Sequence, residues 1–244
     1  MNTANRTILI TGGTSGIGLA LVNQLSKNNC ILVLARSHEK MTTLFGDRHN
    51  IHCYCCDLSA QPDTERTLGK IIKEHPDISM VINNAGVQYT PLLIDEDFEL
   101  KSINEEIQVN LQAPLLLSAI LIKHWRQHNQ PSAIVNISSA LAIFPKTSAA
   151  VYCATKAALH NFSCALNYQL ENTCTQVYEA ILPLVDTPMT SERAGKKISA
   201  DTAATEIIAG INKSKKIIFV GKAKWIPLLS RISPTLVSKI FKKY

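Results

Sequence analysis

Short runs of β-branched and apolar residues alternate with longer amphipathic stretches along most of the chain. Seven runs predict strands, at Thr7–Thr11, Ile31–Ala35, Ile51–Cys56, Ile78–Asn83, Ala133–Ser138, Gln176–Leu182 and Lys216–Val220. Five stretches predict helices, at Ile17–Lys27, Thr64–Glu74, Glu105–Gln127 (bent near Pro114), Tyr152–Glu171 and Ala200–Ile211. This alternation is typical of right-handed βαβ units, in which helices cover both faces of a parallel sheet. We expect an α/β fold with its ligand at the carboxyl ends of the strands.

Length and charge indicate one domain followed by a basic tail. The 244 residues are 46% hydrophobic, which suits one α/β domain, and we assign residues 1–221 to it. All six of the excess positive charges lie in residues 222–244, which contain no acid, so the body is neutral and we expect no nucleic-acid-binding face. The run Ala113–Ile122 is shorter than the ~18 residues of a membrane span, and the first strand begins too early for a signal peptide. We therefore expect a cytoplasmic protein.

The cysteines do not form a recognisable metal or disulfide framework. There are seven, an odd number. Cys53, Cys55 and Cys56 lie in a predicted strand, where alternation would place thiols on opposing faces and make a poor tetrahedral site. We interpret them as small buried apolar groups and expect no metal.

A glycine-rich turn joins the first predicted strand to the first helix, with the sequence Thr-Gly-Gly-Thr-Ser-Gly-Ile-Gly at residues 11–18. Gly12 permits the turn, Gly16 lets the backbone approach a phosphate, and Gly18 allows close packing of helix and strand. Free N–H groups at the helix N-terminus would hold a pyrophosphate. A purely structural turn is the alternative, which the position between strand and helix disfavours. The prediction is a doubly wound, Rossmann-type fold with a mostly parallel seven-stranded sheet.

The end of the second strand indicates which dinucleotide binds. A carboxylate that accepts hydrogen bonds from ribose hydroxyls usually stands here, but this chain has Ala35 followed by Arg36. A guanidinium can form a bidentate contact with a 2′-phosphate. We therefore predict NADP(H) in preference to NAD(H), with a solvated surface arginine as the alternative.

Six motifs in order resemble the short-chain dehydrogenase/reductase family across residues 5–220. They are the turn at 11–18, Asp57-Leu58, Asn83-Asn84-Ala85-Gly86, Asn110, Ser138-Ser139 and Tyr152-x-x-x-Lys156. The segments Val-Tyr-Cys-Ala-Thr-Lys-Ala-Ala-Leu-His and Pro-Leu-Val-Asp-Thr are similar to a branch associated with cell-envelope operons (DltE-like).

The resemblance implies a catalytic set of Asn110, Ser139, Tyr152 and Lys156. It implies that Asp57 and Leu58 flank the adenine and that Thr187 reaches the nicotinamide carboxamide, although Leu184 stands where the family more often has glycine. The full set of expected cofactor contacts is Gly12, Thr14, Ser15, Gly16, Ile17, Gly18, Arg36, Asp57, Leu58, Asn84, Ala85, Gly86, Tyr152, Lys156, Val185 and Thr187.

These residue types suit hydride exchange with a carbonyl. Negative charge that builds on the carbonyl oxygen needs a proton donor, for which Tyr152 is suited, and a hydrogen-bonding group such as Ser139. Lys156 lies one helical turn beyond Tyr152, and its ammonium, with oxidised nicotinamide, would lower the pKa of the phenol. Asn110 would, by resemblance, open its helix and hold a water that relays protons to Lys156. An ordinary surface Tyr–Lys pair is the alternative.

Leu141–Phe144 lie where the family places a substrate wall, which favours a hydrophobic ketone or secondary alcohol. We interpret His160 as structural. The predicted function is an NADP(H)-dependent oxidoreductase. Two alternatives stay open: a cofactor-binding regulator or scaffold without significant turnover, and an epimerase or dehydratase.

The tail has the pattern of an amphipathic helix. Ser233 is a suitable N-cap, and Pro234 suits the first helical position. One face would carry Leu236, Val237, Ile240 and Phe241, opposite Lys239, Lys242 and Lys243. So short a helix needs a surface, either the protein's own body near the substrate cleft or an anionic membrane; disorder is the third possibility. The long helices predict a homodimer or homotetramer.

Overall fold

The computed structural model describes residues 2–242, without the side chain of Leu236. The side chain of Leu236 and the whole of Lys243, both part of the predicted amphipathic helix, therefore lie outside the described part of the chain. Seven parallel strands form the main sheet in the order β3-β2-β1-β4-β5-β6-β9. They are β1 Thr7–Thr11, β2 Cys30–Ala35, β3 Ile51–Cys55, β4 Ile78–Asn83, β5 Ser132–Ser139, β6 Thr175–Leu182 and β9 Ile217–Phe219. The predicted seven-stranded α/β fold is confirmed.

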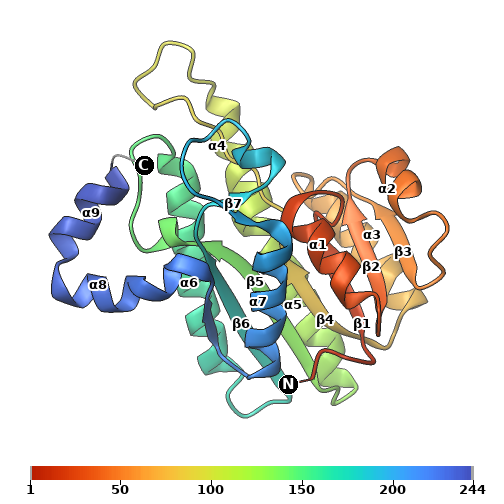
Figure 1. Cartoon of the computed structure of the whole chain (residues 1–244). Coiled ribbons are helices and arrows are strands. Elements are labelled where there is room, and N and C mark those ends of the chain that lie inside the picture. Colours follow the sequence, from red (N-terminus) through yellow and green to blue (C-terminus); the bar gives the residue numbers. More distant parts are fainter. Residues whose placement is uncertain (1, 243–244) are drawn as a thin grey trace.

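Helices cover both faces of this sheet (Figure 1). On one face lie α1 Gly16–Leu25, α2 His38–Phe45 and α7 Ala200–Asn212. On the other lie α3 Gln61–Glu74, α5 Ala113–Gln127 and α6 Ala150–Gln169. Residues of β1 alternate between the two cores: Ile8 and Ile10 pack toward α1 and α7, and Leu9 toward α3 and α5. Burial on both faces explains why this strand is a continuous apolar run.

The predicted helix over Glu105–Gln127 is present, but it begins earlier, at Leu100, and is opened by a π-helical turn before Pro114. The structure has α4 Leu100–Ile107, a π-helical turn at Gln108–Gln112, and then α5. Pro114 lies in the first turn of α5, where a missing backbone N–H is tolerated, so the irregular turn comes before the proline. Helix α2 was not predicted, and α6 begins at Ala150, two residues before the predicted start.

The interpretation of the clustered cysteines is corrected for two of the three. Cys56 is buried, but Cys53 and Cys55 are exposed, because β3 is an outer strand of the sheet and one of its faces is only partly covered. A different group, Cys30, His52 and His75, places ligand atoms within 4.8 Å of one another at the amino ends of the strands, away from the predicted site. The expected absence of a metal stays a prediction.

The tail forms two short helices, α8 Ile226–Ile232 and α9 Pro234–Lys242, of which only the second was predicted. They project beside α6 (Figure 1). Helix α9 returns to the body: the ring centroids of Phe241 and Phe144 are 5.5 Å apart, and the Thr147 hydroxyl donates to the Lys242 carbonyl at 2.8 Å. No helix among the described residues is long and apolar enough to cross a membrane.

Candidate active site

A cleft of about 870 Å³ opens at the carboxyl ends of the strands. It lies where β1 has β2 on one side and β4 on the other, the point at which the chain reverses its direction across the sheet. All but two of the residues predicted for the site line this cleft: Gly12, Thr14, Ser15, Gly16, Ile17, Arg36, Asp57, Leu58, Asn84, Ala85, Gly86, Ser139, Tyr152, Lys156, Val185 and Thr187. The exceptions are Gly18 and Asn110.

The glycine-rich turn has backbone angles that favour glycine. Gly12 and Gly16 have φ angles of +68° and +50°. A Cβ at Gly12 would lie 2.9 Å from the Ala85 Cα, and one at Gly16 would lie 2.9 Å from the Thr187 Cγ2. The turn therefore stays open only with these glycines, and it presents the N-terminus of α1 to the cleft.

Gly18 does not line the cleft, and its expected cofactor contact stays a prediction. A Cβ there would lie 2.2 Å from the Gly12 carbonyl oxygen, which makes Gly18 necessary for packing α1 onto the turn. Asn84 fastens the same turn from β4, since its side-chain amide donates to the carbonyls of Thr11 and Gly12 at 2.9 and 3.2 Å. Asn83 donates to Asn136 at 2.8 Å and braces the sheet.

The end of β2 presents positive charge to the cleft. Ala35 is buried, and the exposed Arg36 follows it as a lining residue. Ser37 caps α2 by accepting from the Lys40 backbone N–H at 3.2 Å, and this brings Lys40 into the same lining. Lys40 was missed because α2 was not predicted; the Ser37 cap was its sequence signal.

Asp57 also faces the cleft, and its carboxylate is already engaged. It accepts from the Ser59 backbone N–H at 3.0 Å and from the Ser59 hydroxyl at 2.8 Å. Two buried polar atoms of the lining, Ser138 Oγ and Gln88 Nε2, have no hydrogen-bond partner among the described residues. The open turn, the lining and these unpaired atoms fit a dinucleotide.

Tyr152 and Lys156 meet at the inner end of the cleft, on one face of α6. The Lys156 ammonium lies 5.6 Å from the centre of the Tyr152 ring and donates to the Ile137 carbonyl at 2.8 Å. Ser139, at the end of β5, lies near enough to Tyr152 to lower the pKa of its phenol slightly, and its hydroxyl accepts from the Leu141 backbone N–H at 3.1 Å. One helix and one strand thus bring together three of the four predicted catalytic residues.

Asn110 is fully buried in the π-helical turn and does not reach the cleft. Its side chain is paired with the Val87 backbone: the amide donates to the carbonyl at 2.8 Å, and the Val87 N–H donates back at 2.8 Å. The opened helix at Asn110 agrees with what the resemblance implied. The side chain itself holds the segment after Gly86 in place.

Burial dominates the ionisation of the Tyr–Lys pair. It raises the pKa of Tyr152 to about 12, and the main opposing charge is Arg193 rather than Lys156. Burial also lowers the pKa of Lys156 to about 8, although Glu179 opposes this shift. The expectation that Lys156 and oxidised nicotinamide together lower the pKa of Tyr152 stays a prediction. Desolvation of the phenolate outweighs the attraction of the charges nearby.

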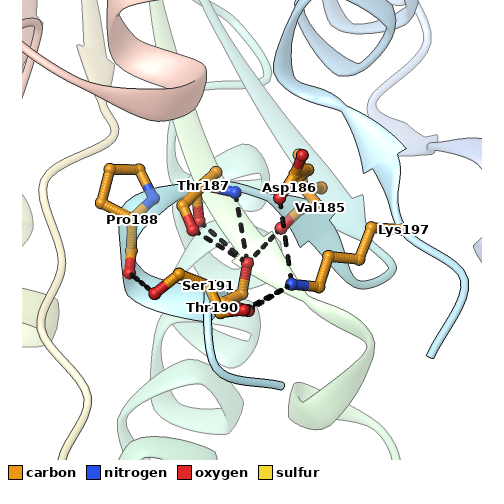
Figure 2. A network of polar contacts seen from close by, with 7 residues as sticks. All are labelled: Val185, Asp186, Thr187, Pro188, Thr190, Ser191 and Lys197. Atoms are coloured by element: carbon orange, nitrogen blue, oxygen red, sulfur yellow. Dashed lines mark hydrogen bonds and ion pairs between the residues drawn. The ribbon is translucent and has the colours of Figure 1, made fainter. Parts of the chain in front are cut away.

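The segment after β6 forms a loop fastened at its base (Figure 2). Val185–Asp186 (β7) pairs with Ile198–Ser199 (β8), and Lys197 donates to the Thr190 carbonyl at 2.6 Å. Thr190 in turn donates to the Val185 carbonyl at 2.5 Å and accepts from the Thr187 backbone N–H at 3.2 Å. This network holds Thr187 against the Gly16 turn, as its predicted place requires, with Leu184 in the lining.

Several lining residues were not predicted. Lys146 lies between Ser139 and Tyr152, and Arg193 and Lys196 come from the fastened loop. The tail contributes Ile226, Leu229, Val237, Ile240 and Phe241, which agrees with the expectation that its apolar face could lie on the body near the cleft. Of the predicted apolar wall, Leu141 lines the cleft, while Ile143 and Phe144 pack in a small core with Ile226 and Phe241. His160 is 2.7 Å from the buried Glu179, in agreement with a structural role.

Comparison with known proteins supports this geometry. The family model for short chain dehydrogenases matches residues 6–197. The chain belongs to the short-chain dehydrogenase family. It is 35% identical over 225 residues to DltE, an uncharacterized oxidoreductase of Bacillus subtilis, covering 89% of each chain. The resemblance to that branch is confirmed, and the chain is an oxidoreductase of this family.

Solved structures share the fold over nearly the whole chain. A short-chain dehydrogenase from Burkholderia cenocepacia, in complex with NADP, has a TM-score of 0.87 at 20% identity and covers 99% of each chain. A short-chain dehydrogenase from Sphingobium yanoikuyae, in complex with NADPH, has a TM-score of 0.83 at 21% identity and covers 95% of each chain. At these identities the likeness establishes the fold.

Proposed function

We propose that this short-chain dehydrogenase exchanges a hydride between NADP(H) and a ketone or secondary alcohol, with Tyr152 as the general acid and base. The observation that carries the proposal is the convergence of Ser139, Tyr152 and Lys156 at the inner end of a cleft that begins at an open glycine turn. When bound, the nicotinamide supplies or accepts the hydride.

In the reducing direction, Tyr152 donates its proton to the carbonyl oxygen while Ser139 holds that oxygen by a hydrogen bond. Lys156 keeps a positive charge beside the phenol and orients the ribose. Asn110 positions the backbone after Gly86, and a water at the π-helical turn passes protons to Lys156. In the oxidising direction the same groups act in reverse.

The preference for NADP(H) rests on Arg36 and Lys40, two cations at the end of β2 with alanine in place of an acid. The two structures named above are complexes with NADP and NADPH, in accord with this proposal. The remaining contacts follow the cleft: Gly12–Ile17 at the pyrophosphate, Asp57 and Leu58 at the adenine, Asn84–Gly86 along the cleft, and Val185 and Thr187 at the nicotinamide.

A panel of ketones and alcohols tests the proposal, with NADPH, NADH and their oxidised forms assayed by the absorbance of reduced nicotinamide. We expect reduction of at least one ketone with NADPH. A protein that binds NADPH tightly and turns over no member of the panel would support the alternative, a cofactor-binding regulator.

We also propose that residues 1–221 form the catalytic body of a cytoplasmic protein, and that the tail at 222–244 touches anionic membrane surfaces. Among the described residues of the tail, Trp225, Leu228 and Ile232 are 60%, 50% and 71% exposed, and the sequence of residues 222–244 carries six basic residues. Sedimentation with vesicles that contain anionic lipid should remove the protein from solution, and added salt should weaken this. Equal sedimentation with neutral vesicles would refute the proposal.

A further inference from the structure

A buried lysine without an acidic partner lies beside the proposed catalytic residues. Lys146 is 6% exposed and lines the cleft. No hydrogen bond or ion pair of its ammonium group is found in the part of the chain that the structure describes. Burial of a charged group is costly, and proteins nearly always pair such a group. The ammonium of a largely buried side chain, unpaired and open to a cleft, indicates an anion that arrives with the ligand.

A second cation faces the same place. Arg193 lies on the fastened loop, is half-buried, and lines the cleft without an ion pair among the described side chains. Burial, and then the charge of Arg193, lower the pKa of Lys146, and the same guanidinium acts on Tyr152. Arg193 therefore lies within electrostatic range of both Lys146 and the phenol. The mutual repulsion of the two cations favours an anion between them.

Nothing acidic in the lining neutralises these charges. Asp57 is the one acid that lines the cleft within residues 2–242, and its carboxylate is held by Ser59 at the predicted adenine end. Glu106 is close enough to act on Tyr152, but it is buried outside the lining and accepts from the Tyr89 backbone N–H at 2.8 Å. The pyrophosphate has its own place at the N-terminus of α1, so the positive charge near Tyr152 remains for the substrate.

The cleft also has an apolar wall, formed by the tail and by the segment after β5. Leu141 and Met189 line it from the body, and Ile226, Val237 and Phe241 from the tail. Val237 is 5% exposed, so α9 rests on the cleft with this side. A substrate here would contact both cations and hydrocarbon.

On the basis of the proposed function, we infer that the substrate is an amphipathic anion. It carries a ketone or secondary alcohol at Tyr152, a carboxylate or phosphate bound by Lys146 and Arg193, and an apolar chain against the tail. This refines the expectation of a hydrophobic ketone, which was drawn from the apolar residues after Ser139 alone.

Matched pairs of substrates test the inference with NADPH. One pair is a keto fatty acid and its methyl ester; the other is hydroxyacetone phosphate and hydroxyacetone. We expect the wild-type protein to favour the anionic member of at least one pair by about 10–100-fold in kcat/KM, the range for a hydrogen bond to a charged group. The pair in which the anionic member is preferred identifies the bound group as a carboxylate or as a phosphate. A ratio near one in both pairs would overturn the inference and leave the reductase proposal intact.

Variants locate the effect. Lys146→Met and Arg193→Met should lower the ratio of kcat/KM for the anion to kcat/KM for its neutral partner by about tenfold or more, while Lys146→Arg should keep that ratio. Lys123→Met, on the exposed side of α5, is the matched control and should leave the ratio unchanged. An NADPH affinity equal to that of the wild-type protein verifies that each variant is folded. If Lys146→Met does not fold, the anion preferences of Arg193→Met and Lys146→Arg test the inference instead. An unchanged preference in Arg193→Met and in the folded Lys146 variant would contradict the inference.

A binding measurement separates this inference from the proposed reaction. Octanoate should raise the melting temperature of the NADPH-saturated wild-type protein more than octanol does, and Lys146→Met and Arg193→Met should lose that difference. If no ketone is reduced but this difference appears, the proposed function fails and the anion site stands. If octanoate and octanol act alike and no substrate pair shows a preference, the anion site is refuted.

Discussion

The phenol of half-buried Tyr152 and the ammonium of buried Lys156 differ in how their pKa values respond to burial. Burial raises the pKa of Tyr152 to about 12, so the side chain keeps its proton at neutral pH, which suits donation to a ketone. Burial lowers the pKa of Lys156 to about 8, so its positive charge is lost only just above neutrality. In the protein without cofactor, the protonated phenol and the charged ammonium therefore favour the reduction of a ketone. Oxidation of an alcohol needs added positive charge to favour the phenolate.

Replacement of Tyr152 by phenylalanine tests the proton donor. Tyr152→Phe should lower kcat for ketone reduction by about 10²–10⁴-fold, the usual contribution of a positioned acid, while NADPH affinity stays nearly unchanged. Tyr168→Phe, at an exposed position of the same helix, is the matched control. Near-parental turnover by Tyr152→Phe would exclude it as the donor.

The lowered pKa of Lys156 predicts a pH profile. Lys156 is charged below its pKa of about 8 and neutral above it, whereas Tyr152 stays protonated until about 12. We expect kcat/KM for reduction to be flat around neutral pH and to fall as pH rises through about 8. Lys156→Arg, which keeps its charge, should lack this fall even if it is slower. A profile without any change near that pH contradicts the assignment.

Arg36 determines the cofactor preference in our proposal. Arg36→Ala should weaken NADPH binding by about 10–100-fold, because a charge-assisted contact to the 2′-phosphate is lost, and should leave NADH binding almost unchanged. Arg126→Ala, at an exposed position of α5, provides the control. Fluorescence titration of each protein gives the dissociation constants. Equal constants for the two cofactors in the parent protein would refute the idea.

Side chains at the ends of regular elements could be placed from the sequence, and those on loops could not. Gly12 and Asn84 follow predicted strands, and Tyr152 and Lys156 share a predicted helical face, so their convergence follows from the topology of the sheet. Lys146 and Arg193 lie on segments whose course depends on tertiary contacts, such as the bonds from Lys197. No local pattern encodes where those segments turn.

Among the elements, the tail differs most from what its pattern alone predicts. The amphipathic spacing predicted α9, but the 3₁₀ turn at Gly221–Trp225 and α8 have no such periodicity. Their place depends on Ala223 and Ile226, which pack against Ala140 in a small third core. The tail is therefore held at both ends, by this core and by the contact of Phe241 with Phe144.

Removal of the tail tests its contribution to stability. Deletion of residues 223–244 uncovers Ala140 and Phe144, and we expect a lower melting temperature because buried apolar surface is lost. Lys239→Ala, at an exposed position of α9, should leave the melting temperature unchanged. An unaltered melting temperature in the deletion would mean that the tail does not stabilise the body.

At the scale of the whole molecule, exposed apolar side chains on the outer helices support assembly. Leu100 on α4 and Tyr168 on α6 are 75% and 78% exposed. We predict a homodimer or homotetramer, and Tyr168→Glu should shift it toward the monomer. Light scattering at micromolar concentration measures the molar mass of the parent protein and of the Tyr168→Glu variant. A monomeric parent protein refutes the prediction.

The order of the strands has a consequence for how the chain folds. β1 pairs with β2, its neighbour in sequence, and with β4, which begins only at Ile78. Until β4 has been synthesised, one edge of β1 has no partner strand. The central residues of β1 are apolar on both faces of the strand. A free apolar edge is a template for pairing with other chains. During synthesis, the early chain up to β3 should therefore be prone to aggregation, and the arrival of β4 should end that period.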